Sequence, residues 1–510
     1  MPADTPFDPL RPDLKLAIAG AGVMGRGIAQ IAAQAGISVL LYDSREGAAA
    51  EAREHVASTL SKLSQKGKLS AEAVERAVSN LQVVRALSDF SACSVVVEAI
   101  VENLEAKREL FRALEGVVAK DCILASNTSS LQVTSIAAAC AHPERVAGYH
   151  FFNPVPLMKV VEVVDSLMTA SWVSDALMAI AKRCGHTPVR AKDTPGFIVN
   201  HAGRGYGTEA LRILSEGIAE FYEIDRILRE SAGFRMGPFE LLDLTGLDVS
   251  HPAMEAIYHQ YYQEPRYRPS QIAAQRTVAG LLGRKSGRGF YRYDTGAQEA
   301  MPAAPAPAVR PARAWVSTRG LGPKLKDLVA RLGATIDGNA TPASGSLCLV
   351  APLGHDATST ALEEGLDPIR TVAVDCFFPL EKRRTLMTTP LTSGAMRDAA
   401  HGLLAADGVP VSVIHDSPGF VNQRVIAQIV NIASDIAQQR IASPADIDAA
   451  VSLGLGYPKG PLAWGDTVGA SRILAILQAL SAFYGDPRYR ASPWLKRRAL
   501  LGVSLLTPEA

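Results

Sequence analysis

Residues 14–192 alternate short apolar runs with longer stretches of helical spacing. The runs at 14–20, 37–43, 94–103 and 122–131 are rich in Val, Ile, Leu and Ala, which is typical of strands buried on both faces of a parallel sheet. Between them, apolar residues recur at the spacing of amphipathic helices. Strands that alternate with helices predict a doubly wound α/β sheet.

The first predicted strand runs directly into a glycine-rich turn, Gly20-Ala21-Gly22-Val23-Met24-Gly25, which is followed by a helix and a second strand. Gly20 permits the tight turn, Gly22 lets the backbone approach a pyrophosphate, and Gly25 lets the helix pack closely on the strand. The N-terminus of the helix offers N–H groups and partial positive charge to phosphates. The order of these elements predicts a Rossmann-type domain that binds a dinucleotide.

Asp43 ends the second strand, 18 positions after Gly25 (43 − 25). Its carboxylate can accept hydrogen bonds from a ribose 2′-hydroxyl and would repel a 2′-phosphate. We therefore predict that the cofactor is NAD rather than NADP, although nearby Arg45 weakens this preference.

From residue 193 onward the pattern changes to long helices without strands. An Ala/Pro-rich stretch, 295–314, predicts an extended linker. Beyond it, DSPGF at 416 repeats DTPGF at 193, and GPLAWGD at 460 repeats GPFELLD at 237, both at an offset of 223 (416 − 193 and 460 − 237). We predict a degenerate second copy of the sheet and its all-α domain. The predicted segments are a tail at 1–13, an NAD-binding domain at 14–192, a helical domain at 193–294, the linker, a degenerate Rossmann-like domain at 315–412 and a second helical domain at 413–510.

Composition limits the classes of function. A chain of 510 residues is expected to form several domains. Lys and Arg number 52 against 51 Asp and Glu, and this balance argues against a nucleic-acid partner. The six cysteines form no CxxC pair, so neither a metal site nor a disulfide framework is predicted. No basic and apolar leader begins the chain, and no apolar run reaches the ~18 residues of a membrane span. The cytoplasm is the expected compartment.

His150 and Glu162 are the strongest candidates for chemistry. They lie in two strand-like runs, 148–152 and 160–164, which a proline-rich turn joins. Such a turn can return the carboxylate to the imidazole, where it fixes the tautomer and raises the basicity of the ring. A lone buried carboxylate is costly in a Val-rich run, although a structural histidine and an edge-strand glutamate would give the same pattern.

Other polar residues follow the predicted strands. Glu102, the cluster at 127–130 and His150 all come at carboxyl ends of strands, where doubly wound sheets bind ligands. Asn200 lies one turn into the first helix of the next domain, and residues at such a seam often bound an active cleft. A basic cluster, Lys62, Lys66 and Lys68, is open to two interpretations: a solvated helix end or an anchor for a phosphorylated substrate.

The motifs together resemble the NAD-dependent 3-hydroxyacyl-CoA dehydrogenases over roughly residues 14–294. The segments that carry the resemblance are GAGVMGRGIAQ, VVVEAIVENLEAK, SNTSSLQVTSIA, HFFNPVPLMKVVEVV, KDTPGFIVN, MGPFELLD and GRKSGRGFYRY. The resemblance implies oxidation of an (S)-3-hydroxyacyl-CoA to the 3-oxoacyl-CoA with NAD, an activity of fatty acid metabolism and beta-oxidation. The duplicated form resembles bacterial members that act on 3-hydroxybutyryl-CoA or 3-hydroxyadipyl-CoA in phenylacetate-type catabolism.

The resemblance also implies roles for single residues. His150 is expected to be the general base and Glu162 its orienting partner. Ser129 and Asn200 are expected to contact the 3-oxygen of the substrate. The residues expected on the NAD side, besides the three glycines, are Asp43, Glu102, Lys107, Ser129, Asn153 and Lys285. The residues expected at the CoA end are Thr59, which stands where the family often has Ser, Lys66 and Lys107.

The second half departs from this pattern. In CFFP, Cys376 is aligned with the histidine of HFFNP, and Gln423 stands at the offset of Asn200. No GxGxxG precedes them, so a second active site is not expected. Helical domains of this family often pair in homodimers. Residues 413–510 are therefore predicted to pack on residues 193–294 as an intrachain pseudo-dimer, with a homodimer left open.

Two other functions compete with this prediction. One is a dehydrogenase of a small free hydroxy acid on the same scaffold, which would have no use for Lys66 as a CoA anchor. The other is a non-catalytic NAD-binding structural or sensor protein, which would not need His150, Glu162 and Asn200 together.

Overall fold

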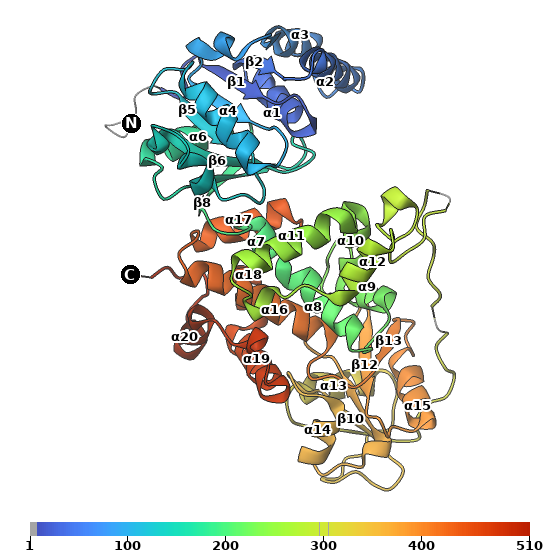
Figure 1. Ribbon diagram of the computed structural model, residues 1–510. Coiled ribbons are helices and arrows are strands. Elements are labelled where there is room, and N and C mark those ends of the chain that lie inside the picture. Colours follow the sequence, from blue (N-terminus) through green and yellow to red (C-terminus); the bar gives the residue numbers. More distant parts are fainter. Residues whose placement is uncertain (1–7, 295, 304, 510) are drawn as a thin grey trace. The chain divides into compact units, whose positions relative to one another are not determined.

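The computed structural model describes residues 8–294, 296–303 and 305–509 (Figure 1). The predicted tail and linker therefore lie partly outside the described residues. The chain forms two compact units. The first contains Met1–His201 together with Gln439–Leu455, and the second contains Ala202–Gln438 together with Gly456–Ala510.

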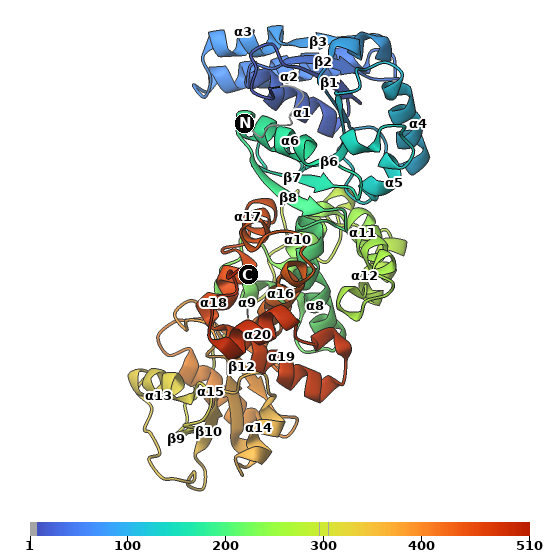
Figure 2. The same cartoon turned by 90° about the vertical axis from the view of Figure 1, so that its left-hand side faces the viewer.

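The first unit is built on an eight-stranded sheet of order β3-β2-β1-β4-β5-β6-β7-β8 (Figure 2). All neighbours are parallel except β6 and β7, which are antiparallel. The strands are β1 Lys15–Ala19, β2 Ser38–Tyr42, β3 Leu81–Val83, β4 Val95–Glu98, β5 Ile123–Ser126, β6 Val146–Phe151, β7 Val160–Asp165 and β8 Thr187–Lys192.

Helices cover both faces of this sheet. One face packs on α1, α2, α3 and α6, and the other packs on α4 and α5. The bounds are α1 Val23–Gln34, α2 Ala48–Gln65, α3 Ala71–Ser79, α4 Leu104–Glu115, α5 Val133–Ala137, α6 Ser171–Arg183 and the short α7 Val199–Ala202. Continuous apolar strands between two helical layers confirm the predicted doubly wound, Rossmann-type fold.

One helix of the first unit comes from far along the chain. Helix α17, Pro444–Gly454, packs on β7 and β8 (Figure 2). Its Ile447, Ala450 and Val451 side chains are fully buried. Just before it, the Ile441 carbonyl accepts a hydrogen bond of 2.8 Å from the Lys192 N–H at the end of β8.

The second unit contains the two helical domains. The first comprises α8 Arg204–Ser215, α9 Phe221–Glu230, α10 Pro238–Thr245, α11 Leu247–Gln260 and α12 Gln271–Val278; the second comprises α16 Val421–Gln438, α18 Pro461–Val468, α19 Ala470–Tyr484 and α20 Pro493–Leu501. Helices α8 and α16 pack closely: a Cβ on Gly205 would lie 3.1 Å from the backbone of Ile429. The copies also exchange matching bonds, since Arg266 donates to the Arg490 carbonyl at 2.8 Å and Arg488 donates to the Arg268 carbonyl at 3.2 Å.

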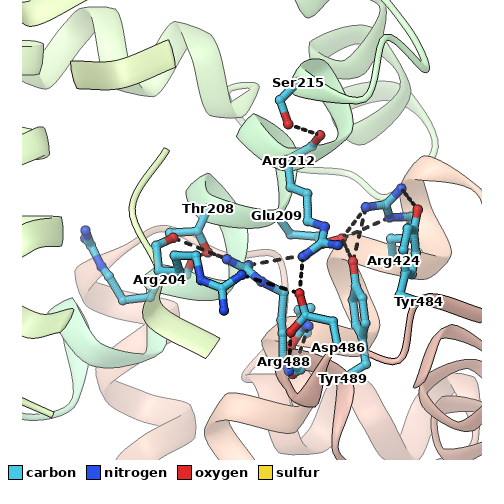
Figure 3. Close-up of polar contacts among 12 residues, drawn as sticks. Arg204, Thr208, Glu209, Arg212, Ser215, Arg424, Tyr484, Asp486, Arg488 and Tyr489 are labelled. Atoms are coloured by element: carbon cyan, nitrogen blue, oxygen red, sulfur yellow. Dashed lines mark hydrogen bonds and ion pairs between the residues drawn. The ribbon is translucent and has the colours of Figure 1, made fainter. Parts of the chain in front are cut away.

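A buried polar network joins these two helical domains (Figure 3). Glu209 of α8 is fully buried and lies 2.9 Å from both Nε and Nη2 of Arg424 on α16. It also accepts a bond of 2.9 Å from the Tyr489 hydroxyl. Beside it, Arg212 of α8 pairs with Asp486 at 2.6 Å. Both charges of the central pair therefore have several partners, as buried charges require.

The same unit holds a second sheet, of order β13-β12-β11-β10-β9. Its β11 and β12 are antiparallel and β12 and β13 are parallel, which repeats the pattern of β6, β7 and β8. Asp416 accepts backbone N–H bonds at the start of α14, as Asp193 does at the start of α5. These features confirm the predicted degenerate second copy. The elements are β9 Ala314–Val316, α13 Gly322–Arg331, β10 Leu347–Val350, α14 Ala357–Glu363, β11 Thr371–Val374, β12 Arg384–Thr388, α15 Gly394–Leu404 and β13 Val411–Ile414.

Within the described residues, no single helix has the length and apolar character of a membrane span. Helices α18 and α19 satisfy the two criteria only when they are taken together, and the chain bends by 93° between them.

Candidate active site

His150 and Glu162 lie directly opposite each other on the antiparallel strands β6 and β7. The imidazole Nδ1 is 2.6 Å from a carboxylate oxygen of Glu162. The other oxygen accepts backbone N–H bonds from Ile198 at 2.9 Å and Val199 at 2.8 Å. Glu162 is fully buried and His150 is 4% exposed. With Nδ1 held in this way, Nε2 is the ring nitrogen that can serve a substrate.

Two aromatic rings lie beside the histidine, and one amide holds its strand. The ring of Phe152 lies 4.4 Å from the imidazole and that of Phe197 lies 5.7 Å away, measured between centroids. The Asn127 side-chain oxygen accepts the backbone N–H of Phe151 at 2.9 Å, which ties the end of β5 to the strand that carries His150. The sequence predicted Asn127 only as a member of the polar cluster at 127–130, because the order of residues does not show which strand its side chain contacts.

A second buried network lies at the ends of β4 and β5. Glu98 is fully buried and accepts bonds of 2.6 Å from both the Lys107 ammonium and the Ser126 hydroxyl. Lys107 is only 1% exposed and also lies 3.2 Å from Glu102. Lys107 therefore links the two carboxylates. Glu98 was not predicted as a site residue, although it is, like Glu162, a lone acid in a Val-rich strand.

Glu102 holds the loop that contains Ser129. One carboxylate oxygen accepts the Thr128 hydroxyl at 2.7 Å and the backbone N–H groups of Ser129 and Ser130 at 2.9 and 3.0 Å. Burial alone would raise the pKa of the Glu102 carboxyl, but the Lys107 charge and these hydrogen bonds lower that pKa to about 2. Glu102 is therefore a fixed anion that positions the loop.

The glycine turn has the geometry that dinucleotide binding needs. A Cβ on Gly25 would lie 1.8 Å from the Gly20 carbonyl oxygen, so helix α1 and β1 approach as closely as glycine allows. A Cβ on Gly22 would meet nothing within 4 Å, which leaves the first turn of α1 open to a phosphate. Asp43 accepts the N–H of Ala21 at 2.7 Å. Arg45 faces Glu51 at 2.6 Å, so its charge is compensated.

The remaining predicted residues are distributed over both units. Thr59 is half-buried on α2 and Lys66 is exposed just after it, while Asn153 is exposed beyond β6 and Asn200 lies in α7. All four belong to the unit of His150. Lys285 belongs to the other unit, where its ammonium pairs with Asp248 at 2.6 Å.

The second sheet has different residues at the corresponding positions. At the repeat offset of 223, the position that corresponds to Glu162 is Thr385. Thr385 lies opposite Asp375 in the paired strands, and the Asp375 N–H donates to the Thr385 carbonyl. Asp375, rather than the predicted Cys376, thus occupies the histidine position, because the turn between the paired strands is two residues shorter (385 − 375 = 10 against 162 − 150 = 12). Gln423 donates to Asp375 at 3.0 Å and accepts the Gly354 N–H at 2.8 Å. Burial raises the pKa of the Asp375 carboxyl although the bond from Gln423 opposes this shift.

The strand-to-helix turn after β9 keeps only its last glycine. A Cβ on Gly322 would lie 1.9 Å from the Ser317 carbonyl oxygen, which matches the contact of Gly25 with Gly20. The positions of the first two glycines hold Ser317 and Arg319. An arginine where the backbone must approach a pyrophosphate does not suit dinucleotide binding.

Comparison with known families gives two matches. The model of the 3-hydroxyacyl-CoA dehydrogenase NAD binding domain matches residues 15–194. The model of the C-terminal domain of the same family matches residues 196–293 and again 419–504.

Individual relatives agree with these matches. The chain is 37% identical to the 3-hydroxyadipyl-CoA dehydrogenase of Escherichia coli K12 over 95% of its length and 97% of that protein. It is 42% identical to the human mitochondrial hydroxyacyl-coenzyme A dehydrogenase over 54% of its length and 90% of that protein. The crystal structure of 3-hydroxybutyryl-CoA dehydrogenase from Escherichia coli K12 superposes with a TM-score of 0.86 at 36% identity, and covers 96% of this chain and 98% of that one.

Proposed function

We propose how this chain, which belongs to the 3-hydroxyacyl-CoA dehydrogenase family, carries out its reaction. The enzyme is an NAD-dependent oxidoreductase that interconverts a 3-hydroxyacyl-CoA and the 3-oxoacyl-CoA. The observation that carries the proposal is the buried contact of 2.6 Å between His150 and Glu162.

His150 acts as the general base toward the (S)-3-hydroxyl group. Loss of a hydride from C3 leaves positive character on that carbon, so the hydroxyl must give up its proton in the same step. The Nε2 atom of His150 accepts that proton, and a positioned base of this kind contributes about 10²–10⁴-fold to the rate. Glu162 stabilises the imidazolium that forms, and the two backbone N–H donors on Glu162 keep its carboxylate oriented.

Ser129 and Asn200 hold the 3-oxygen of the substrate. Ser129 is fixed through its backbone N–H to Glu102, and Asn200 follows directly on Val199, which donates to Glu162. The backbone at or next to each of these two residues is therefore fixed by a hydrogen bond to a carboxylate of the site. In the reverse direction the same groups polarise the 3-oxo group while His150 returns its proton.

The residues of the turn and of the strand ends fit NAD. Gly20, Gly22 and Gly25 would hold the pyrophosphate and Asp43 the adenosine ribose. Because Glu51 pairs with the positive charge of Arg45, the negative charge of Asp43 is the one that discriminates against a 2′-phosphate. The remaining groups proposed for the NAD side are Glu102, Lys107, Asn153 and Lys285. NAD, when bound, supplies the acceptor for the hydride.

The CoA end of the substrate is proposed to contact Thr59 and Lys66. Lys66 is exposed at the end of α2 and can reach a phosphate of CoA. Lys107 is nearly fully buried between two carboxylates, so its proposed contribution is to position Glu102. From the names of the relatives, we propose 3-hydroxyadipyl-CoA or 3-hydroxybutyryl-CoA as the substrate, in phenylacetate-type catabolism.

Replacement of the base tests the mechanism. We expect His150→Gln to lower kcat by about 10²–10⁴-fold because the proton acceptor is lost, while the affinity for NADH stays within about twofold of wild type. Turnover is measured with acetoacetyl-CoA and NADH by absorbance at about 340 nm, the usual band of NADH. An equal loss of turnover and NADH affinity would show that His150 is a structural residue.

Removal of a surface charge tests the CoA handle. Lys66→Gln should raise the KM for acetoacetyl-CoA about three- to tenfold at low salt and less at high salt, because a solvent-exposed ion pair is screened. Lys326→Gln, an exposed lysine on α13 of the second unit, is the matched control. A KM that does not change in Lys66→Gln would favour a small free hydroxy acid as the substrate.

The paired helical domains support a proposal about assembly. The packing of α8 on α16 and the matching bonds of Arg266 and Arg488 resemble a twofold interface formed within one chain. We propose that this intrachain pseudo-dimer takes the place of a homodimer. The cytoplasm is the proposed compartment on the sequence features given above, and cell fractionation tests it.

A further inference from the structure

Helix α17 comes from the second helical domain, yet it belongs to the unit that holds His150. It packs on β7, the strand of Glu162, and on β8 beside it. Three buried apolar side chains, Ile447, Ala450 and Val451, fix it there. A helix from far along the chain thus covers the strand that carries Glu162 and the strand beside it.

Gly454 ends α17 at a point where a side chain has no room. A Cβ on Gly454 would lie 3.0 Å from both γ-carbons of Val199 and 3.5 Å from a γ-carbon of Val160. Its φ angle is not in the left-handed region, so the backbone does not require glycine. Glycine is also a poorer helix former than alanine. Close packing is therefore the reason for glycine at this position.

Val199 connects this contact to the catalytic pair. Its backbone N–H donates to Glu162 at 2.8 Å, and the neighbouring N–H of Ile198 donates to the same oxygen. The other oxygen of Glu162 holds Nδ1 of His150. A displacement of Val199 would therefore shift the Glu162 carboxylate, and with it the imidazole of His150.

The corresponding position in the other copy is not glycine. The offset of 223 takes Gly454 back to Ser231 (454 − 223) at the end of α9. The Ser231 hydroxyl donates to the Arg383 carbonyl at 3.4 Å, next to the strand that carries Thr385 in place of Glu162. The helix end therefore has no side chain where it packs on Val199 and Val160 of the unit with the histidine and carboxylate, and it has a side chain beside the second sheet, which lacks that pair.

We infer that Gly454 is a positioning residue for the reaction: helix α17 holds Val199, and through it Glu162 and His150, in the geometry of catalysis. The inference rests on the proposed roles of His150 and Glu162. It gives the second copy a task in catalysis although that copy has no base of its own.

The test places a side chain at Gly454 in the full-length enzyme. Gly454→Val should lower kcat at least about tenfold and Gly454→Ala about threefold, because shifts of about 1 Å in catalytic groups cost up to about 10²-fold. Affinity for NADH should stay within about twofold, since no proposed cofactor contact is touched. Ser231→Val places the same valine side chain at the equivalent helix end and should leave kcat within about twofold of wild type.

A second substitution distinguishes positioning from general damage. Val199→Ala removes the two γ-carbons that the added side chain would meet and keeps the backbone N–H to Glu162. The Gly454→Ala/Val199→Ala enzyme should therefore recover most of the kcat that Gly454→Ala loses. If Gly454→Val does not fold, as judged by circular dichroism, Gly454→Ala and this double variant show whether Gly454 positions the catalytic pair.

Two results would overturn the inference. In one, kcat of the folded Gly454 variants equals that of wild type. In the other, kcat, NADH affinity and melting temperature fall together in the Gly454 and Ser231 variants alike. His150→Gln separates these results from failure of the proposed function. An active His150→Gln enzyme refutes the proposed role of His150 as the base, whereas an inactive one with unimpaired Gly454 variants refutes only this inference.

Discussion

Three carboxylates of the first unit are each held by several hydrogen-bond donors. Glu98 and Glu162 are fully buried, and the structure gives each of them at least three donors. Glu102 is partly exposed and is held by Lys107 and the loop of Ser129. Buried carboxylates without such donors would be costly to the fold.

Glu102 makes stability depend on pH. Its pKa of about 2 in the folded enzyme lies below the ordinary value of 4.5, so its stabilising effect is complete above about pH 4.5 and is lost as the pH falls toward 2. We expect Glu102→Gln to lower the melting temperature clearly at pH 7, with a difference from wild type that shrinks between pH 4.5 and 2. Differential scanning calorimetry across this range measures the difference. Glu105→Gln, an exposed carboxylate in the first turn of α4, should show only a small effect, and a difference for Glu102→Gln that does not vary with pH would contradict the prediction.

Among single residues, the sequence predicted the His150–Glu162 contact because two strands joined by a short turn can pair in few registers. It did not predict that Glu98 and Glu102 share Lys107. The three residues are close in sequence but lie on a strand, in the loop after it and on a helix, so their spacing fits neither a strand nor a helix period. The error at Cys376 has a similar cause: aligning CFFP with HFFNP ignores a turn that is two residues shorter.

Among the elements, the packing of α8 on α16 depends on a buried ion pair. Glu209 and Arg424 are both fully buried, so removal of one charge leaves the other without its main partner. We expect Arg424→Met to lower the free energy of unfolding by about 3–5 kcal/mol, the usual cost of breaking a buried pair. Urea unfolding followed by circular dichroism measures this, with Arg472→Met at an exposed site of α19 as the control.

The double variant Glu209→Leu/Arg424→Met should be more stable than Arg424→Met alone, because no buried charge is then left unpaired. Equal stability of the two variants would mean that the network in Figure 3 contributes through packing rather than through charge.

The elements themselves were predictable to different degrees. The apolar runs identified most strands of the first sheet, and the repeat at 223 identified the second copy, since both rest on local patterns. The place of α17 was not predictable in this way. An amphipathic helix shows which face is buried but not which partner covers it.

For the whole molecule, the two copies make contacts that separate subunits could also make. Because α16 covers α8 within one chain, we expect a mass near 54.1 kDa in solution, measured by light scattering after gel filtration. A mass near twice this value at micromolar concentration would show that the covered face is not the only surface through which this chain associates.

The path of α17 has a consequence for how the enzyme is made. The first sheet and its cofactor turn emerge early from the ribosome, but the helix that completes their unit ends at Gly454, in a chain of 510 residues. Vectorial synthesis therefore leaves the face of β7 and β8 uncovered until residues 444–454 have been made. A nascent chain arrested before this helix emerges should be cut by protease near β8, and the finished protein should resist cleavage there.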